Sequence, residues 1–308
     1  MKTAIVGGGI NGLYLAWKLA ERGNEVSVFE RKKEIGKREC SGFFSNRIFN
    51  FIPSCRRLVQ NEINSALIHF PKKSVRVDFS RKFFLMSHFE LDKLVADLAE
   101  KAGARIFLGS EITAIPSGFD RIIGCDGPNS FVRESLGIKK PEFRIAIQGT
   151  IPVQNKSDFV ETWASPSGFI WKIPRGNETE YGIMGNLKEA KEILEKFLKE
   201  REVKLENIGA GLVPLGLRVS FNPQIALCGD AAGLCKPWSG GGVIWGLTAA
   251  DLLLKSFPDF VEYMNVAKRF FLPRIFLSQL ATKTVYFLGN NLPFLLPKRV
   301  RIESDFLL

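Results

Sequence analysis

The sequence predicts an α/β fold in which a nucleotide-binding domain carries an inserted antiparallel sheet and a helical C-terminal region. Three observations predict it: a glycine-rich strand–turn–helix at the N-terminus, a second one more than 200 residues later, and alternating apolar residues between them. We expect residues 1–140 and 205–256 to form the nucleotide-binding domain, with short substrate-side strands within 60–90. Residues 141–204 should form the antiparallel sheet, and residues 257–308 the helical region.

The N-terminal unit begins with Thr3–Val6, an apolar run rich in β-branched residues that is typical of a buried strand. The segment 7–12, GGGING, follows with the spacing G-x-G-x-x-G. We then expect a helix over Leu13–Arg22 and a second strand over Glu25–Phe29, with Glu30 at its end. Strand, glycine turn, helix, strand and acid in this order are the dinucleotide-binding unit of a Rossmann-like domain.

Each residue type in this unit has an expected role. Gly7 permits the tight turn, Gly9 lets the backbone approach a pyrophosphate, and Gly12 lets the helix pack close to the strand. The pyrophosphate meets unpaired N–H groups at the start of the helix. Glu30 accepts hydrogen bonds from the adenosine ribose hydroxyls and disfavours NADP, because it repels a 2′-phosphate. The predicted cofactor contacts of this unit are Gly7, Gly9, Ile10, Asn11, Gly12, Glu30 and Arg31.

The second strand–turn–helix indicates FAD as the cofactor. The stretch Ile225–Gly233 is again typical of a strand and a turn and contains Gly229-Asp230, and a helix expected over 240–255 opens with three glycines. A second glycine-rich helix start is hard to explain for NAD, whereas FAD is long enough to reach both. Asp230 is our candidate for the acid that meets the ribityl chain, and a helix N-cap is its other interpretation. The predicted contacts here are Gly229, Asp230, Gly240, Gly241, Gly242 and Val243.

The other elements are expected from periodicity and from glycine and proline positions. We expect helices over 46–52, 56–65, Phe89–Ala102 and Lys188–Glu200. We expect strands over 66–70, 74–79, 83–86, 104–108, 111–115 and 120–124, and an antiparallel sheet over 143–184.

Composition bounds the class of protein. The chain has 308 residues, of which 45% are apolar, and a formal net charge of +11. It contains no run of about 18 apolar residues that would predict a transmembrane helix. The five cysteines form no C-x-x-C pair and the two histidines have no ligand spacing, so we expect reduced thiols in a cytosolic protein and no metal site. No aromatic-plus-basic motif predicts nucleic-acid binding.

Several motifs taken together resemble the para-hydroxybenzoate hydroxylase-like FAD superfamily and, within it, the geranylgeranyl reductase family. The motifs are G-x-G-x-x-G at 7–12, Cys125-Asp126-Gly127 with Ser130 and Arg133, and GDAAG at 229–233 with Pro237 and the glycines 240–242. The segment 169–175, FIWKIPR, resembles the family's aromatic-x-Trp-x-Phe-Pro-Lys motif, and Cys40-Ser41-Gly42 resembles its cysteine–glycine segment. Ile173 and Arg175 replace the usual Phe and Lys, and His88 stands where arginine is usual.

The resemblance covers residues 1–256 and implies that reduced FAD saturates isolated C=C bonds of polyprenyl lipids. Such a bond is a poor hydride acceptor, so the site must hold it against the flavin and supply a proton to the other carbon. Cys40 is the candidate to donate that proton or to tune the flavin, and Trp171 is the candidate to line the substrate channel. A buried thiol and a core aromatic are their plainer interpretations. The resemblance also adds Asp126 and Cys40 to the predicted FAD contacts.

Two other functions stay open at this point. One is a flavin-dependent monooxygenase or halogenase of the same superfamily, and the other is a flavoprotein that passes electrons to a quinone or a partner. The electron donor, a reduced nicotinamide or ferredoxin, is not specified by the sequence. The stretch from Phe257 interleaves apolar residues with cations, which suits either a peripheral membrane contact or helices packed over the substrate domain.

Overall fold

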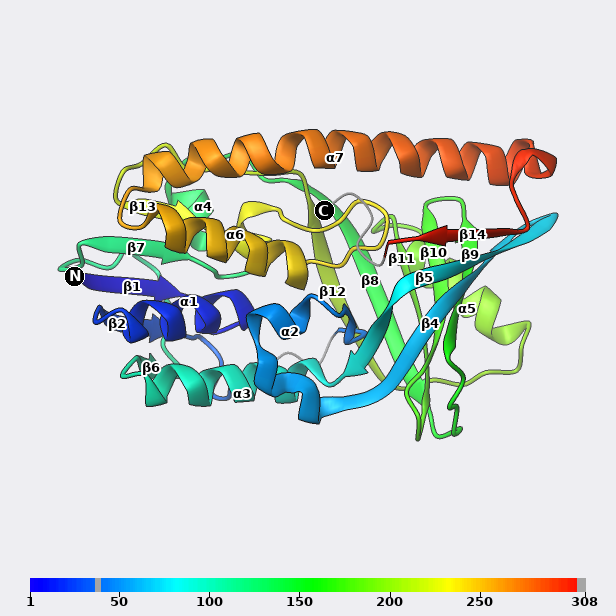
Figure 1. Ribbon diagram of the computed structural model, residues 1–308, viewed down its shortest axis with the longest axis horizontal. Helices are drawn as coiled ribbons and strands as arrows, with labels where there is room; N and C mark the ends of the chain where they lie inside the picture. The colour runs from blue at the N-terminus through cyan, green and yellow to red at the C-terminus, as the bar shows by residue number, and fades with distance from the viewer. Residues whose placement is uncertain (37–39, 304–308) are drawn as a thin grey trace.

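The computed structural model describes residues 1–36 and 40–303 of the chain. In these ranges the strands form two sheets that follow one another along the long axis of the molecule (Figure 1). Sheet A has the strand order β13-β7-β1-β2-β6, and all of its neighbouring strands are parallel. Its members are β1 (Lys2–Val6), β2 (Glu25–Phe29), β6 (Arg105–Phe107), β7 (Arg121–Gly124) and β13 (Ile225–Leu227).

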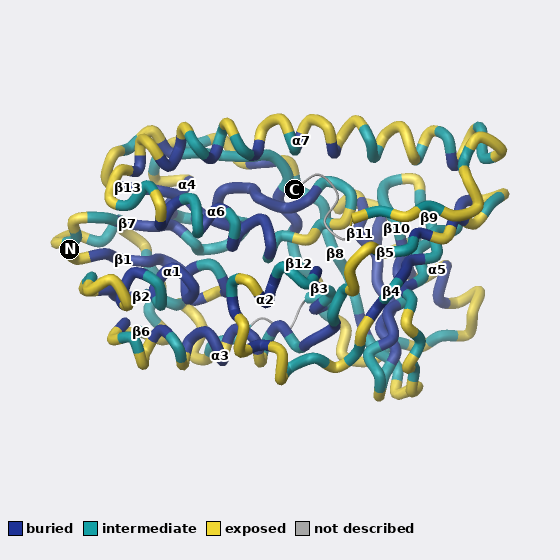
Figure 2. The backbone as a smooth tube through the Cα atoms, in the orientation of Figure 1, coloured by how far each residue is buried: buried dark blue, intermediate teal, exposed yellow. Residues whose placement is uncertain are grey.

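Three helices pack beside one another over sheet A. The central one, α1 (Ile10–Glu21), contacts α3 (His88–Lys101) on one side and α6 (Val243–Ser256) on the other. Their inner faces are apolar, and Figure 2 shows α1 and the inner side of α6 as buried. The expected strand–turn–helix–strand order is therefore confirmed. The helix α1 begins three residues earlier than expected because Gly9 is its N-cap, so the glycine turn itself forms the first helical turn.

Sheet B forms the other half of the molecule, with the order β12-β8-β11-β10-β9-β4-β5-β14 and β3 paired to β5. One of its faces packs on α5 (Ala190–Lys199), and the other encloses the apolar interior described below. Side chains alternate between the two faces, so Ile170 points to α5 while Trp171 points to the interior. The strands are β3 (Phe43–Ser45), β4 (Val59–Phe70), β5 (Lys73–Met86), β8 (Glu142–Ile151), β9 (Phe159–Ser165), β10 (Gly168–Pro174), β11 (Thr179–Gly185), β12 (Glu206–Leu215) and β14 (Arg299–Ile302).

Several expected elements are wrong. The helix over 56–65 does not form: a 3₁₀ turn, η1 (Pro53–Leu58), leads directly into β4. The three short strands within 66–86 are instead parts of one long hairpin, β4–β5, whose register shifts twice. The expected strand 111–115 is irregular, and the helix over 46–52 is reduced to the single turn α2 (Ile48–Phe51).

The C-terminal region crosses both halves of the molecule. The helix α7 (Phe260–Asn291) runs along the upper edge in Figure 1, and the Asp259 side chain caps its N-terminus. Near its other end, the Tyr286 hydroxyl donates to the carbonyl oxygen of Gly168 in β10 at 3.0 Å. A short turn, η3 (Pro293–Leu295), then leads to β14, which pairs in parallel with β5.

The division into domains stays a prediction. Strand β12, which we assigned to the nucleotide-binding part, pairs with β8 at one edge of sheet B, and β14 forms the opposite edge. Two further short elements, α4 (Phe131–Ser135) and the 3₁₀ turn η2 (Gly229–Ala232), follow β7 and β13. Across the described ranges, no helix has both the length and the apolar character needed to cross a bilayer.

Candidate functional site

One cavity of about 930 Å³ runs from the glycine turn of α1 to the inner face of sheet B. It brings together most of the residues that the sequence singled out. Of the predicted site residues, only Gly12 and Gly229 are absent from its wall. Those that line it are Gly7, Gly9, Ile10, Asn11, Glu30, Arg31, Cys40, Asp126, Trp171, Asp230, Gly240, Gly241, Gly242 and Val243.

The first glycine turn has the geometry expected of it. Gly7 has φ +106°, and a Cβ there would lie 2.4 Å from the carbonyl oxygen of Cys125. A Cβ on Gly12 would lie 2.1 Å from the carbonyl oxygen of Gly7, so α1 can approach β1 only without a side chain. Gly9 faces open space, since a Cβ there meets nothing within 4 Å. The turn and the close packing are present, and contact of Gly9 with a pyrophosphate stays a prediction.

Glu30 is held at the edge of this turn. One carboxylate oxygen accepts from the Gly8 N–H at 2.6 Å, and the other accepts from the Lys32 N–H at 2.8 Å. These bonds orient the carboxylate on the cavity wall, where ribose hydroxyls can donate to it. They also explain the middle glycine, because a Cβ on Gly8 would lie 3.0 Å from Cβ of Glu30.

The second glycine turn opens onto the same cavity. Gly240 has φ +69°, and Gly242 is the N-cap of α6. A Cβ on Gly242 would lie 2.8 Å from Oδ1 of Asp230, which also accepts from the Cys235 thiol at 3.4 Å. Asp230 lies within the turn η2, whose N-cap is Cys228, so the N-cap interpretation of Asp230 is wrong.

Asn11 joins the two glycine turns. Its side chain lies against Gly229 and Gly246, where a Cβ would come within 2.2 Å and 2.5 Å of its amide. Gly229 therefore serves packing between α1 and the second turn. The Asn11 Oδ1 is buried on the cavity wall and has no hydrogen-bond partner among the residues that the structure describes, and the same holds for Oδ1 of Asp126.

These features fit FAD. The starts of α1 and α6 both face the cavity, and neither has a side-chain cap, so their N–H groups are available to an anion such as a pyrophosphate. The two buried acceptors, Asn11 Oδ1 and Asp126 Oδ1, call for donors, and the ribose and ribityl hydroxyls are groups of that kind. Beyond the nucleotide end the wall becomes apolar, with Val77, Phe79 and Trp171, as an aromatic ring system and an alkyl chain require.

A buried carboxylate fixes the motif 169–175 and the segment beside it. Glu180 is 1% exposed and accepts from the Trp171 indole N–H at 2.8 Å and from Arg175 Nε at 2.7 Å. Arg175 donates onward to the carbonyl oxygens of Cys40 and Ser41, at 3.3 and 2.5 Å. The motif therefore holds the backbone on which the Cys40 thiol stands. Sequence reasoning missed Glu180, although a single carboxylate in the otherwise apolar run TEYGIMG was a usable signal.

A second charged pair lies next to Cys40. Nε2 of His88 is 3.3 Å from Oδ1 of Asp92, one helical turn further along α3, and both residues are buried and line the cavity. Burial alone lowers the pKa of His88, but its interactions with Asp92 and Cys40 outweigh burial and raise this pKa to about 10. The imidazole is thus held protonated beside the thiol. The i,i+4 spacing of the pair was visible in the sequence.

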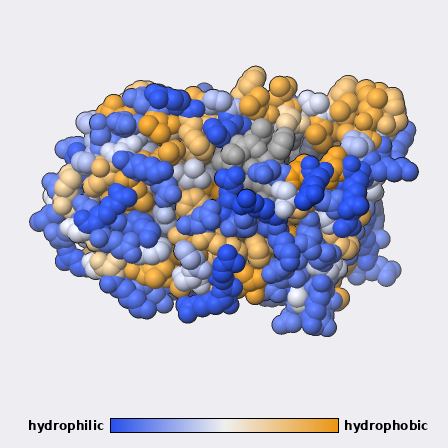
Figure 3. Space-filling model, in the orientation of Figure 1, coloured by the Kyte–Doolittle hydropathy of each residue, from blue (hydrophilic) through white to orange (hydrophobic). Residues whose placement is uncertain are grey.

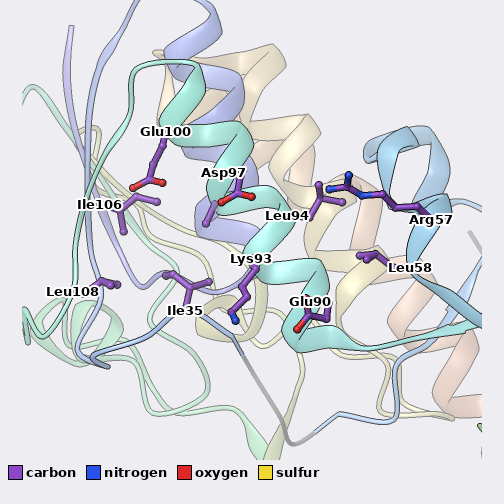
Figure 4. Close-up of a pocket in the computed structure, with 11 residues that line it drawn as sticks. Ile35, Arg57, Leu58, Glu90, Lys93, Leu94, Asp97, Glu100, Ile106 and Leu108 are labelled. Atoms are coloured by element: carbon purple, nitrogen blue, oxygen red, sulfur yellow. The ribbon is translucent and has the colours of Figure 1, made fainter. Parts of the chain in front are cut away.

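A second, smaller pocket of about 410 Å³ lies on the outer side of α3 (Figure 4). Glu90, Lys93, Asp97 and Glu100 stand along it from the helix, opposite Ile106 and Leu108. Its charges are mixed and it holds no glycine turn, so it does not resemble a nucleotide site. Among the described residues, no cluster of three or more His, Cys, Asp or Glu side chains could hold a metal ion.

Comparison with known proteins agrees with this geometry. The family model described as an NAD(P)-binding Rossmann-like domain matches residues 5–42. Digeranylgeranylglycerophospholipid reductase 2 of Methanothermobacter thermautotrophicus is 25% identical over 87% of this chain and 80% of its own length. Among solved structures, a geranylgeranyl bacteriochlorophyll reductase-like protein from Thermoplasma acidophilum has a TM-score of 0.80 and 22% identity, covering 94% of this chain and 87% of its own.

A myxobacterial structure, the chondrochloren halogenase CndH, described as a variant of FAD-dependent halogenases, has a TM-score of 0.75 and 15% identity. It covers 94% of this chain and 83% of its own. These likenesses confirm the predicted α/β fold and the resemblance to the geranylgeranyl reductase family that the motifs indicated.

Proposed function

We propose that the protein is an FAD-dependent oxidoreductase that reduces isolated C=C bonds of a polyprenyl lipid, of the geranylgeranyl class. One observation carries the proposal: a single cavity joins a dinucleotide cradle to a long apolar chamber in sheet B. The named relatives support the same activity, since they are digeranylgeranylglycerophospholipid reductases and resemble this chain over most of its length.

The residues around the cavity have distinct tasks in this proposal. The starts of α1 and α6 bind the pyrophosphate and the pyrimidine end of FAD, and Glu30 and Asp230 bind its hydroxyls. When bound, FAD in its reduced form supplies the hydride. Trp171 forms part of the wall that presses the prenyl chain into place and excludes water.

Cys40 is the proposed proton donor to the second carbon of the double bond. His88 stands next to it with its pKa raised, because Asp92 and Cys40 stabilise the imidazolium despite burial. The thiol and the imidazolium together can therefore hold and replace a proton at Sγ on the wall of the cavity. Arg175 acts on this step by position, since it binds the Cys40 and Ser41 carbonyls.

The second candidate is a flavin-dependent monooxygenase or halogenase, which the structural likeness to halogenases supports at the level of fold. The apolar character of the chamber favours the reductase. Electron transfer to a quinone or a protein partner is the third candidate, and the donor to FAD, a reduced nicotinamide or ferredoxin, stays open. All five cysteines are free thiols, which supports a reducing compartment such as the cytoplasm. We also propose a peripheral membrane contact, because a polyprenyl lipid resides in a bilayer.

The deciding experiment uses the flavin-loaded protein reduced with dithionite. Geranylgeranyl diphosphate and geranylgeranyl glycerolipids are offered separately, and products are read by mass spectrometry as a gain of about two hydrogens per bond. A gain with either substrate supports the reductase. No gain with either, together with a peroxyflavin spectrum after addition of oxygen, would move the assignment to the monooxygenase class.

A further inference from the structure

The outer surface of α7 and η3 is unusually apolar. Eight of the sixteen large apolar side chains that are exposed in the described ranges lie between residues 272 and 295. Figure 3 shows orange atoms gathered in groups along the upper edge of the molecule, where α7 runs, and at its upper right end. We call this set the α7–η3 patch. Its members are Leu272, Phe276, Leu277, Leu280, Val285, Phe287, Phe294 and Leu295.

The helix α7 separates its two apolar faces by helical spacing. Phe276, Leu280 and Phe287 repeat at intervals of four and seven residues and point outward, with exposures of 65, 54 and 58%. Ser278, Ala281 and Thr282 lie on the opposite side and line the cavity. A helix that only covered the cavity would have a polar outer face, so the outward stripe requires another apolar environment.

The charged residues of this region are all positive. From Tyr263 to Ile302 the sequence has seven lysines and arginines and no aspartate or glutamate. Lys283 lies within the outward stripe of α7, and Lys298 and Arg301 follow η3, all of them exposed. Apolar side chains rimmed by cations complement an anionic lipid surface, where the cations are attracted to the headgroups.

The patch is continuous with the apolar end of the cavity. Val285 belongs to the patch and also lines the cavity, and the segment after η3 passes from exposed Phe294 and Leu295 to Leu296 and Pro297 on the cavity wall. The part of the cavity wall formed by α7 and by residues 296–302 therefore lies next to the exposed phenylalanines.

We propose that the α7–η3 patch docks on an anionic phospholipid bilayer and opens the apolar end of the cavity toward the membrane. A prenyl chain then enters between α7 and residues 296–302 without crossing water. The identity of this cargo rests on the proposed function, whereas docking itself does not.

Docking is tested with the flavin-loaded full chain and vesicles of phosphatidylcholine with or without phosphatidylglycerol, read by co-sedimentation at low and high salt. The double variant Phe276→Ser/Phe294→Ser removes two exposed rings that do not line the cavity, and we expect its partition coefficient to fall at least about tenfold. The matched control Ile208→Ser/Leu187→Ser alters two exposed apolar residues elsewhere and should bind like the wild type. Lys283→Gln/Lys298→Gln should weaken binding only to the anionic vesicles.

The proposal is overturned if the wild type stays in the supernatant with anionic vesicles, or if the double phenylalanine variant sediments like the wild type. The oligomeric state, measured by light scattering, gives a further test. If the wild type is a dimer and the double phenylalanine variant is a monomer, a second copy of the chain covers the patch and the proposal is overturned. An activity assay tests separately whether the prenyl chain enters the cavity from the membrane. The variant should reduce prenyl substrate dissolved in detergent at the wild-type rate and lose at least about tenfold on substrate embedded in vesicles. Failure to reduce either form by the wild type would count against the proposed function and leave docking intact.

Discussion

Replacing Glu180 by glutamine tests whether this buried carboxylate organises the site. Glu180 is 1% exposed and uses both oxygens, one for the Trp171 indole and one for the Arg175 guanidinium. A glutamine side chain has only one acceptor oxygen, so one of these two donors would face the amide NH₂ group and lose its hydrogen bond. The variant therefore loses one charge-assisted hydrogen bond, while Arg175 keeps its bonds to the Cys40 and Ser41 carbonyls. We expect the free energy of unfolding to fall by about 2–3 kcal/mol.

The assay is urea unfolding of the wild type, Glu180→Gln, Arg175→Gln and the double variant, which together form a double-mutant cycle. The two single variants each remove the same interaction. The sum of their losses in the free energy of unfolding should therefore exceed the loss in the double variant by at least about 1 kcal/mol. The control is Glu161→Gln on β9. Its partners Lys172 and His69 lie 3.0 and 3.5 Å away but are partly exposed, so its loss should stay below about 1 kcal/mol. Additive losses, or a change in Glu180→Gln no larger than that of the control, would refute the reasoning.

Three further predictions concern the cofactor, the proton and the pH dependence. Gly12→Ala should remove FAD binding, because its Cβ would lie 2.1 Å from the Gly7 carbonyl oxygen; a yellow protein with wild-type affinity would contradict this. Cys40→Ser should keep FAD and lower the rate of double-bond reduction by about 10²–10⁴-fold in single-turnover assays, whereas an unchanged rate would exclude Cys40 as donor. The raised pKa of His88 stabilises the fold fully below its ordinary value of 6.5, and this stabilisation is lost as pH rises through about 10. Asp92→Asn should flatten that decline in urea midpoints, and a slope equal to the wild type would oppose the assignment.

The nucleotide-binding half was largely predictable because its signals are local. The turn at 7–12 allows few conformations: Gly7 and Gly12 are both pressed against backbone atoms, so their positions report geometry directly. The second glycine turn carried the same kind of signal, and the cavity does join the two. The roles assigned to these residues toward FAD stay predictions until a complex is measured.

The half formed by sheet B was predicted less well because its determinants are distant in sequence. The hairpin β4–β5 contains two register shifts, so its apolar residues lose the strict alternation that marks a strand, and 56–65 resembled a helix. Glu180 meets Arg175 and Trp171 only through the pairing of β10 with β11. The partnership of Arg175 with the Cys40 carbonyl spans 135 residues, and no local pattern could indicate it.

The helix α7 has a mechanical consequence for how this protein can move. It is secured on the nucleotide half by its contact with β13, and on the half formed by sheet B by the Tyr286–Gly168 bond and by β14, which follows it into that sheet. This helix has 32 residues and is about 48 Å long, so it spans the two halves of the molecule and connects them. A rotation of one half against the other would therefore have to bend α7, which contains Pro273, or break its contacts with one of the halves.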